Sequence, residues 1–290
     1  MLNILTTGAD GQLGSELRIL AENSANNFIF TDIARLDITD ADAVKSFVTE
    51  CRPDVIINCA AYTDVEHAED DEQTAYGINC TAAENLAQAA KLADALLIHI
   101  STDYIFDGNS RTPYTEDMPA APLNAYGRTK LAGEQAIIGS GCRYIILRTA
   151  WLYSGFGRNF LKTMLRLTAE KESVNVVSDQ FGCPTYAADL AQAVFDIAES
   201  DSLRINQGVY HFTGEGECSW YDFACAIAAE AGNNGCKITP CRTEEFPSKA
   251  KRPAYSVLDN SKYKRTFGAA IPHWRESVRR CINRINNDSI

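Results

Sequence analysis

Tyr126 and Lys130 are the two residues whose types and spacing most directly suggest chemistry. Of the 12 tyrosines, only Tyr126 is followed four residues later by a lysine. On a helix, this spacing puts both side chains on one face, one turn apart. A free phenol has a pKa of about 10, and a neighbouring ammonium favours the phenolate and lowers that pKa. The pair predicts a proton-transferring tyrosine helped by Lys130, although an exposed helix carrying both residues by chance has the same spacing.

The segment Ser101–Gly108 favours the chemical interpretation. It begins where an apolar strand, Leu96–Ser101, should end, and it supplies side-chain hydroxyls there. A hydroxyl at that place can bond both a substrate carbonyl and a tyrosine oxygen. Hydroxyl, phenol and ammonium together form a proton relay that can face a nicotinamide. We therefore predict that a hydroxyl of this segment acts together with Tyr126 and Lys130.

The elements that must position this relay alternate between short apolar runs and longer amphipathic segments. Both faces of the strand-like runs are apolar, as in parallel strands covered by helices on each side. Such alternation predicts an α/β fold with a doubly wound parallel sheet of the Rossmann type. The expected strands are Leu2–Thr7, Phe28–Thr31, Val55–Ala60, Leu96–Ser101, Tyr144–Leu147 and Val174–Val177, and the expected helices are Gly11–Leu20, Ala41–Cys51, Thr74–Leu92, Ala125–Ile138 and Asn159–Lys171.

A looser pattern after about residue 200 predicts a smaller mixed α/β lobe that binds the substrate. Gly208–Phe212 is typical of a strand, Trp220–Ala231 and Ile271–Ile285 of helices, and Asn233–Pro253 of a loop-rich segment. We expect residues 1–150 and about 174–200 to form the dinucleotide-binding domain. Residues of about 151–173 and 201–290 should form the substrate lobe.

A G-x-x-G-x-x-G run, Gly8 to Gly14, follows the first strand and opens the first helix. Glycines allow a tight turn and close approach to a pyrophosphate, which the helix N-terminus then holds. Asp32, after the second strand, can bond the adenosine ribose and favours NAD, whereas Arg35 could bind a 2′-phosphate and admit NADP. The predicted cofactor contacts are Gly8, Gly11, Gln12, Leu13, Gly14, Asp32, Asp37, Ile38, Ala60, Ala61, Tyr62, Thr63, Ile100, Tyr126 and Lys130.

Composition excludes several other classes of protein. The 290 residues carry a formal charge of −11, which argues against binding to nucleic acid or an anionic membrane. The apolar runs are too short for a membrane helix, and the N-terminus has no signal-peptide pattern, so we expect a soluble, cytoplasmic protein. The ten cysteines form no C-x-x-C pair, and the four histidines have no metal-binding spacing; we expect structural thiols and no zinc.

These motifs resemble the extended short-chain dehydrogenase/reductase family. Further stretches resemble the branch of that family that reduces 4-keto sugars carried on dTDP, and Arg148–Tyr153 is the most specific of them. The matching stretches run almost from end to end: Arg52–Asn58, Ser101–Gly108, Pro122–Glu134, Arg148–Tyr153, Asn159–Arg166, Asp179–Thr185 and Arg252–Pro253.

The resemblance implies reduction of a 4-keto nucleotide sugar by NADPH or NADH. Tyr126 would donate the proton, Thr102 would tune it, and Lys130 would hold the nicotinamide ribose. The implied substrate contacts are Thr102, Asp103, Tyr104, Trp151, Val65 and Arg252, the last as a partner for the diphosphate. We expect Trp220 and Trp274 to be packing anchors, and the acidic run from Glu66 to Glu72 to be a solvated loop.

Two alternatives stay open at this stage. A nucleotide-sugar dehydratase or epimerase has the same fold, but family dehydratases carry Asp-Glu after the threonine, where this chain has Asp103 and Tyr104. A non-catalytic NADP-binding regulatory subunit, similar to the beta subunit of methionine adenosyltransferase, is the second. Some reductases of the family hold Mg²⁺ at a dimer contact through glutamates. Glu16 matches one such position, but Ala188 stands at the other, so we predict no metal ligands and regard bound Mg²⁺ as doubtful. A homodimer is a possible assembly.

Overall fold

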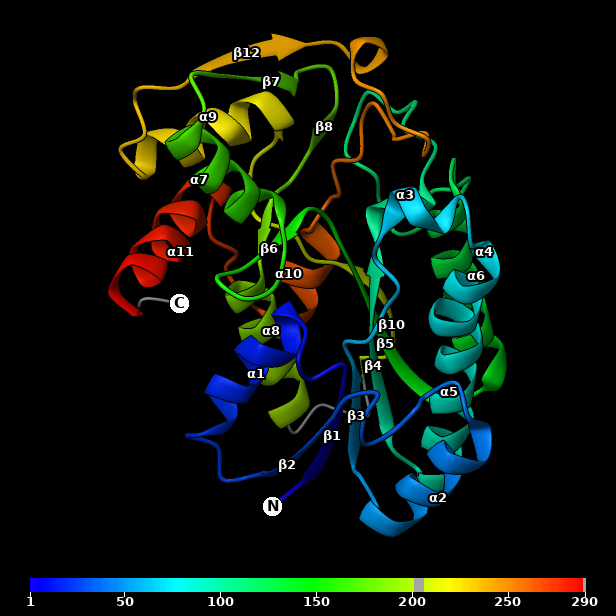
Figure 1. Cartoon of the computed structure of the whole chain (residues 1–290). Coiled ribbons are helices and arrows are strands. Elements are labelled where there is room, and N and C mark those ends of the chain that lie inside the picture. Colours follow the sequence, from blue (N-terminus) through cyan, green and yellow to red (C-terminus); the bar gives the residue numbers. More distant parts are fainter. Residues whose placement is uncertain (201–205, 289–290) are drawn as a thin grey trace.

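The computed structural model describes residues 1–200 and 206–288, and its centre is a six-stranded parallel sheet (Figure 1). The strand order is β10-β5-β4-β3-β1-β2. The strands are β1 (Asn3–Thr7), β2 (Asn27–Thr31), β3 (Val55–Asn58), β4 (Leu96–Thr102), β5 (Arg143–Thr149) and β10 (Gly208–His211). The predicted doubly wound α/β fold is confirmed.

Helices cover both faces of this sheet because its strands are apolar on both sides. On one face, Ile4, Ile57 and Ile98 pack against α1 (Gln12–Ala21), α8 (Ala187–Glu199) and α10 (Ser261–Phe267). On the other, Leu5, Ile56 and Leu97 pack against α2 (Ala41–Cys51), α5 (Ala82–Ala93) and α6 (Ala125–Ser140). In Figure 1 the two sets of helices lie left and right of the sheet.

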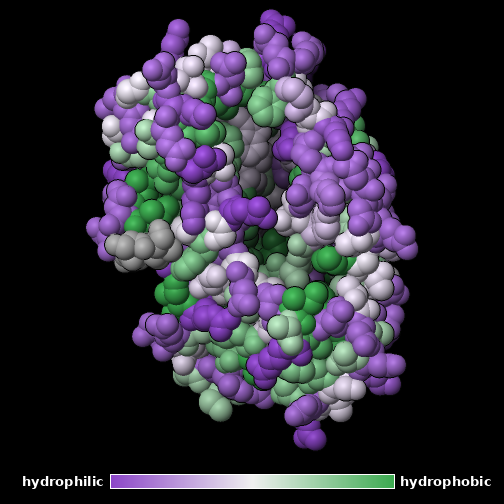
Figure 2. Space-filling model, in the orientation of Figure 1, coloured by the Kyte–Doolittle hydropathy of each residue, from purple (hydrophilic) through white to green (hydrophobic). Residues whose placement is uncertain are grey.

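The order of the strands determines where a ligand can bind. The chain passes from β1 outward to β2 and then returns to the other side of β1 as β3. In doubly wound sheets, ligands bind beyond the carboxyl ends of the strands at such a reversal. Seen from the same side as in Figure 1, the molecule is hollowed near its centre, and hydrophobic residues lie in the hollow (Figure 2).

A smaller layer lies above the central sheet in Figure 1. Its core joins α7 (Phe160–Glu170), α9 (Trp220–Glu230) and α11 (Trp274–Asp288), with Phe223 and Trp274 fully buried. A parallel strand pair, β7 (Ser173–Val177) with β12 (Lys237–Cys241), covers it. Short pairs join β6 (Leu152–Tyr153) to β9 (Thr185–Tyr186), and β8 (Phe181–Gly182) to β11 (Cys218–Ser219).

Three local predictions differ from the structure. Residues 173–177 pair with β12 and not with the central sheet, whereas residues 208–211 supply its sixth strand. The segment predicted as loop-rich contains β12 and a short 3-10 helix, Thr243–Glu245. Strand pairing over this sequence distance is set by tertiary packing, which local patterns do not encode.

The predicted helix Thr74–Leu92 is divided into α4 (Glu72–Tyr76), a π-helical turn (Gly77–Thr81) and α5. Asn79 in that turn hydrogen-bonds both Tyr62 N and Tyr62 O, and also Thr129 Oγ1 on α6. A Cβ on Gly133 would lie 2.1 Å from Asn79 O, so α6 approaches the turn as closely as backbone allows. Single π-helical turns of this kind often lie at functional sites.

Within residues 1–200 and 206–288, no helix combines the length and the apolar character that a membrane span needs. All ten cysteines are free thiols. Burial raises the pKa of Cys183 to about 12, as expected of a thiol that packs as a small apolar side chain.

Candidate active site

The side chain of Thr102 lies beside the phenol of Tyr126 and lowers its pKa. Thr102 is the last residue of β4, and it caps the short 3-10 helix Asp103–Ile105 by accepting from Tyr104 N at 3.1 Å. Tyr126 lies in the first turn of α6, which begins where Asn124 Oδ1 accepts from Gly127 N at 2.8 Å. A Cβ on Gly127 would lie 2.2 Å from Tyr104 O, so this glycine lets α6 pack directly on the 3-10 helix.

Burial keeps the Tyr126 phenol protonated. Burial raises the pKa of the Tyr126 phenol, the nearby Thr102 side chain opposes this rise, and the neighbouring Asp103 and Tyr104 add to it. Burial also raises the pKa of Asp103 to about 7. A protonated phenol next to a hydroxyl is the form needed to donate a proton to a carbonyl oxygen.

The expected effect of Lys130 on Tyr126 does not hold in this structure. The pKa of Tyr126 is raised, not lowered, and Lys130 does not contribute to its shift. Lys130 instead donates from Nζ to Ile100 O at 2.6 Å, and it lies 3.3 Å from His99 Nε2. The partners recorded for the Lys130 ammonium are thus this carbonyl of β4 and the imidazole of His99.

A buried ion pair fixes the strand ends around the relay. Glu134, one turn beyond Lys130 on α6, bonds Arg148 Nη2 at 2.7 Å and Ser101 Oγ at 2.5 Å. Arg148 also lies 3.4 Å from His211 Nε2. Burial first, and the charge of Arg148 second, lower the pKa of His211 to about 3. The network joins α6 to the carboxyl ends of β4, β5 and β10.

The glycine turn after β1 is shaped for close approach. Gly8 has a φ of +65°, and a Cβ there would lie 2.5 Å from Ala60 N after β3. A Cβ on Gly14 would lie 2.5 Å from Gly8 O, so the third glycine lets α1 pack against the turn. Gly11 is the N-cap of α1, and no side chain caps that end. A pyrophosphate fits such a turn because backbone N–H groups are available and no side chain obstructs them.

The other predicted cofactor residues fall into two groups. Asp32, at the end of β2, accepts from Asp10 N at 3.0 Å and so lies beside the turn, while Arg35 donates to Phe30 O at 3.1 Å. Exposed Asp37 accepts hydrogen bonds from the side chain and backbone of Thr39, which lower its pKa. Five further predicted residues lie after the carboxyl ends of β1 or β3: Gln12, Ala60, Ala61, Tyr62 and Thr63. Leu13 and Ile38, by contrast, are buried in the two hydrophobic cores, so their side chains are not available to a ligand.

The predicted substrate residue Arg252 lies close to the relay. Its guanidinium donates to Tyr104 Oη at 3.1 Å and to Glu66 Oε1 at 2.9 Å. The Tyr104 ring in turn contacts the ring of Tyr126 edge-on, with centroids 5.8 Å apart. Only two contacts therefore separate the guanidinium from the phenol.

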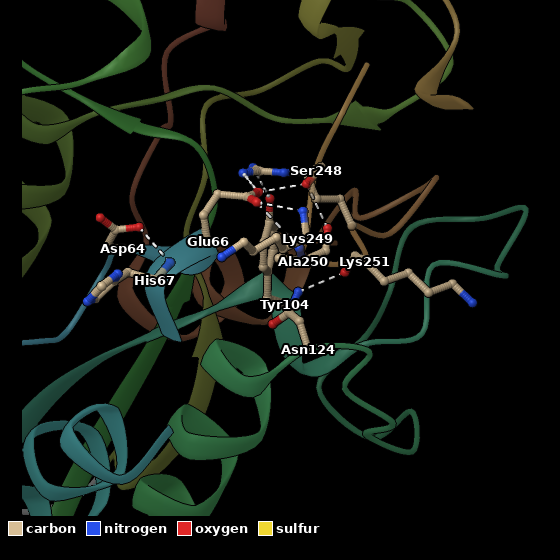
Figure 3. Close-up of polar contacts among 10 residues, drawn as sticks. Asp64, Glu66, His67, Tyr104, Asn124, Ser248, Lys249, Ala250 and Lys251 are labelled. Carbon is tan, nitrogen blue, oxygen red and sulfur yellow. Dashed lines mark hydrogen bonds and ion pairs between the residues drawn. The ribbon is translucent and has the colours of Figure 1, made fainter. Parts of the chain in front are cut away.

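Glu66 is an important residue that the sequence did not reveal. From α3 (Val65–Ala68) it accepts from Ser248 Oγ at 2.6 Å and from Lys249 N at 2.8 Å, as Figure 3 shows. Burial alone would raise the pKa of the Glu66 carboxyl. The hydrogen bonds from Ser248 and Arg252 outweigh this effect and lower the pKa to about 2. Residues 64–70 and residues 247–249 border a cavity of about 610 Å³, which is lined by Asp64, Glu66, His67, Asp70, Pro247, Ser248 and Lys249.

The acidic run therefore does more than face solvent. Glu69 accepts from Ala125 N at the start of α6, and Glu72 pairs with Arg128 on the same helix. Asp70 pairs with Lys249. These contacts connect residues more than fifty positions apart, and no local pattern signals them.

Trp151 lies in a strained conformation held by aromatic stacking. Its φ is +49°, a left-handed value that a bulky residue rarely adopts. Its ring stacks on Trp220 with centroids 3.6 Å apart and planes 10° apart, and a Cβ on Gly182 would clash with it. Trp220 is thus a packing anchor as expected, and the residue that it supports is the predicted substrate contact.

Glu16 is engaged by protein groups. It accepts from Ser154 Oγ at 2.7 Å and pairs with Arg284 at 2.7 Å. Among the described residues, no three His, Cys, Asp or Glu side chains are grouped as a metal site requires.

Comparison with known proteins identifies the family. The family model for the RmlD substrate binding domain matches residues 2–287. A dTDP-4-dehydrorhamnose reductase of Aggregatibacter actinomycetemcomitans is 40% identical over 287 residues, covering 96% of this chain and 98% of that enzyme. The crystal structure of a dTDP-4-dehydrorhamnose reductase of Clostridium acetobutylicum matches with a TM-score of 0.94 and 44% identity, covering 98% and 100% of the two chains.

A second solved structure is that of the dTDP-4-dehydrorhamnose reductase of Bacillus anthracis in complex with NADP. It matches with a TM-score of 0.91 and 40% identity over 97% of this chain and 99% of that one. The fold and the similarity over nearly the full length of the chain point to the same family. The chain belongs to the dTDP-4-dehydrorhamnose reductase family.

Proposed function

We propose that the protein reduces the 4-keto group of dTDP-4-dehydro-L-rhamnose to give dTDP-L-rhamnose, with NADPH or NADH as the reductant. The placement of the Thr102 hydroxyl, at the end of β4, beside the Tyr126 phenol, in the first turn of α6, carries this proposal. It presents a protonated phenol at the carboxyl edge of the sheet, the same edge that holds the glycine turn. When bound, the nicotinamide supplies the hydride.

The residues of the relay have separate tasks in this reaction. Tyr126 donates its proton to the carbonyl oxygen as that oxygen becomes an alkoxide, and Thr102 hydrogen-bonds the phenol and the sugar. Lys130 returns a proton to the phenolate and holds the nicotinamide ribose. Asp103, Tyr104, Val65 and Trp151 contact the sugar, and Arg252 binds the diphosphate.

The glycine turn, Asp10 and Asp32 would hold the adenosine half of the cofactor. The bound NADP of the Bacillus anthracis relative supports NADPH as a cofactor. We place the protein in the cytoplasm, with a nucleotide sugar as its substrate and a homodimer as a possible assembly. We keep 1–150 with about 174–200, and about 151–173 with 201–290, as the proposed domain limits, apart from the strands reassigned above.

Two features favour simple reduction over the alternatives. Tyr104 follows Asp103, so the second carboxylate of a dehydratase is absent from that position. The intact pair of Thr102 and Tyr126 favours an enzyme over a regulatory subunit.

The test of the proposed function is steady-state oxidation of NADPH and of NADH in the presence of dTDP-4-dehydro-L-rhamnose. Turnover is expected; tight cofactor binding without turnover would favour the regulatory subunit.

Arg252→Met should raise the KM for the nucleotide sugar by about tenfold to a hundredfold. The guanidinium lies two contacts from Tyr126, and losing a hydrogen bond to a charged group costs ~1.5–3 kcal/mol. The kcat at saturation and the Kd for NADPH should each stay within about twofold of the wild-type value, because neither depends on contacts with the diphosphate of the nucleotide sugar. Lys251→Met, at the exposed neighbouring position, is the matched control. An unchanged KM in Arg252→Met would remove Arg252 from the substrate site.

A further inference from the structure

Three buried polar residues form a ladder across the sheet that ends at Lys130. Thr7 on β1 is paired in register with Asn58 on β3, and Asn58 is paired with His99 on β4. Each is at most 1% exposed. Uncharged polar side chains in such positions are costly unless they are hydrogen bonded to one another. The proposed function assigns this ladder no task.

The direction of each hydrogen bond in the ladder is fixed by a backbone group. Ala60 N–H is only a donor, and it donates to Asn58 Oδ1 at 3.1 Å, as does Thr7 Oγ1 at 2.8 Å. The amide nitrogen of Asn58 must therefore be the atom 3.1 Å from His99 Nδ1, and it donates there. His99 Nδ1 is an acceptor, so the neutral imidazole carries its proton on Nε2.

This tautomer has a consequence for Lys130. His99 Nε2 lies 3.3 Å from Lys130 Nζ, and its N–H faces that nitrogen. An ammonium has three donors and no acceptor, so it meets the N–H unfavourably. An uncharged amine has a lone pair and accepts from it. The imidazole therefore favours the amine over the ammonium.

We propose that His99, oriented by Asn58, is a positioning residue that makes Lys130 a ready proton donor during turnover. The inference rests on the proposed reduction and adds a residue to it. Once Tyr126 has given its proton to the sugar oxygen, the phenolate needs another. Lys130 passes one proton to it through an intervening hydroxyl, and becomes an amine that accepts from His99 Nε2–H. A proton taken up from the solvent, the one that the reduction consumes, then restores the ammonium.

The other ionisable groups around Lys130 allow this balance. Glu134 lies one turn along α6 and favours the ammonium, but its charge is paired with Arg148 from β5. Tyr126 is uncharged in the resting state. Burial lowers the pKa of Lys130 to about 8, against the opposing effect of Glu134. Burial, and then the charge of Lys130, lower the pKa of His99 well below its usual value, so the imidazole stays neutral.

The variant that tests this inference is His99→Gln. A glutamine can turn its Oε1 toward Lys130 and accept from the ammonium, so it should raise the pKa of Lys130. In the wild type, kcat should fall as pH rises through about 8, because the ammonium is lost there. In His99→Gln this fall should move to higher pH by about one unit, the size of shift that one neighbouring group produces.

Two further variants separate this effect from a loss of packing. His211→Gln replaces another buried imidazole beside a cation, but one that does not contact Lys130, and it should leave the fall in kcat in place. The carboxylate of Asn58→Asp accepts a hydrogen bond from His99 Nδ1–H, which places the imidazole proton on Nδ1 and leaves Nε2 as an acceptor, so this variant should shift the profile in the same direction as His99→Gln. If His99→Gln is folded and its profile coincides with that of the wild type, the proposal is overturned. Equal shifts in His99→Gln and His211→Gln would overturn it as well.

The titration of Lys130 can also be read without substrate. The ¹³Cε NMR signal that Lys130→Met removes should titrate near pH 8 in the wild type and at higher pH in His99→Gln. Wild-type protein that binds NADPH but does not turn over would refute the proposed function, whereas an unshifted ¹³Cε titration in His99→Gln would refute the role of His99.

Discussion

Tyr126→Phe should lower kcat by about a thousandfold while leaving the Kd for NADPH nearly unchanged. The phenol is the protonated acid beside Thr102, and a positioned general acid contributes about a hundredfold to ten-thousandfold. Phenylalanine keeps the ring and its edge contact with Tyr104, so the loss is confined to the proton. Stopped-flow and steady-state kinetics with the 4-keto sugar measure kcat, and quenching of protein fluorescence measures Kd.

Tyr76→Phe is the matched control for this variant. Tyr76 is exposed at the end of α4, so the same change of side chain should leave both constants unaltered. A Tyr126→Phe protein that keeps more than about a tenth of the wild-type kcat would contradict the proton-donor role. A protein that also loses NADPH affinity would indicate a disturbed fold rather than a lost acid.

Glu134→Gln should lower the free energy of unfolding by about 3–5 kcal/mol, because it leaves Arg148 charged and buried without its partner. The side chains of Glu134 and Arg148 are 1% and 8% exposed, and the carboxylate also bonds Ser101 Oγ. Turnover should fall too, since the network holds the end of β4 next to Thr102. Urea denaturation measures the loss of stability.

The exposed pair of Arg166 and Glu170 on α7 provides the control. Its side chains are 60% and 56% exposed, so Glu170→Gln should cost only a few tenths of a kcal/mol, the value of about 0.3–0.5 typical of such helix pairs. The double variant Glu134→Gln/Arg148→Met should recover part of the stability that Glu134→Gln loses, because no charge then stays unpaired. A Glu134→Gln protein as stable as Glu170→Gln would refute this account of the network.

The parts of the site that are local in sequence were predictable. The glycines from Gly8 to Gly14, the one-turn spacing of Tyr126 and Lys130, and the position of Thr102 at a strand end each follow from a short stretch of chain. The side-chain conformation of Lys130 could not be predicted, because the carbonyl of Ile100 and the ring of His99 become its neighbours only when β4 packs against α6. Spacing places a residue on a helix face but does not show where a long side chain turns.

Contacts between distant segments were beyond sequence reasoning for the same reason. Glu66 and Arg252 meet across 186 positions, and Asn58 and His99 meet only because β3 and β4 pair in one particular register. The strands β7 and β10 have similar apolar patterns, yet one joins the small layer and the other the central sheet. Helix periodicity likewise did not reveal the π-helical turn before α5, which depends on the contacts of Asn79 with Tyr62 and α6.

The most direct test of the central claim follows the hydride itself. The protein is incubated with dTDP-4-dehydro-L-rhamnose and NADPH that is dideuterated at the reactive carbon of the nicotinamide, and the product is analysed by NMR and mass spectrometry. The account predicts one deuterium at C4 of the sugar for each NADPH oxidised, and almost none with Tyr126→Phe. Conversion of the sugar without deuterium, or oxidation of NADPH without a reduced sugar, would contradict it.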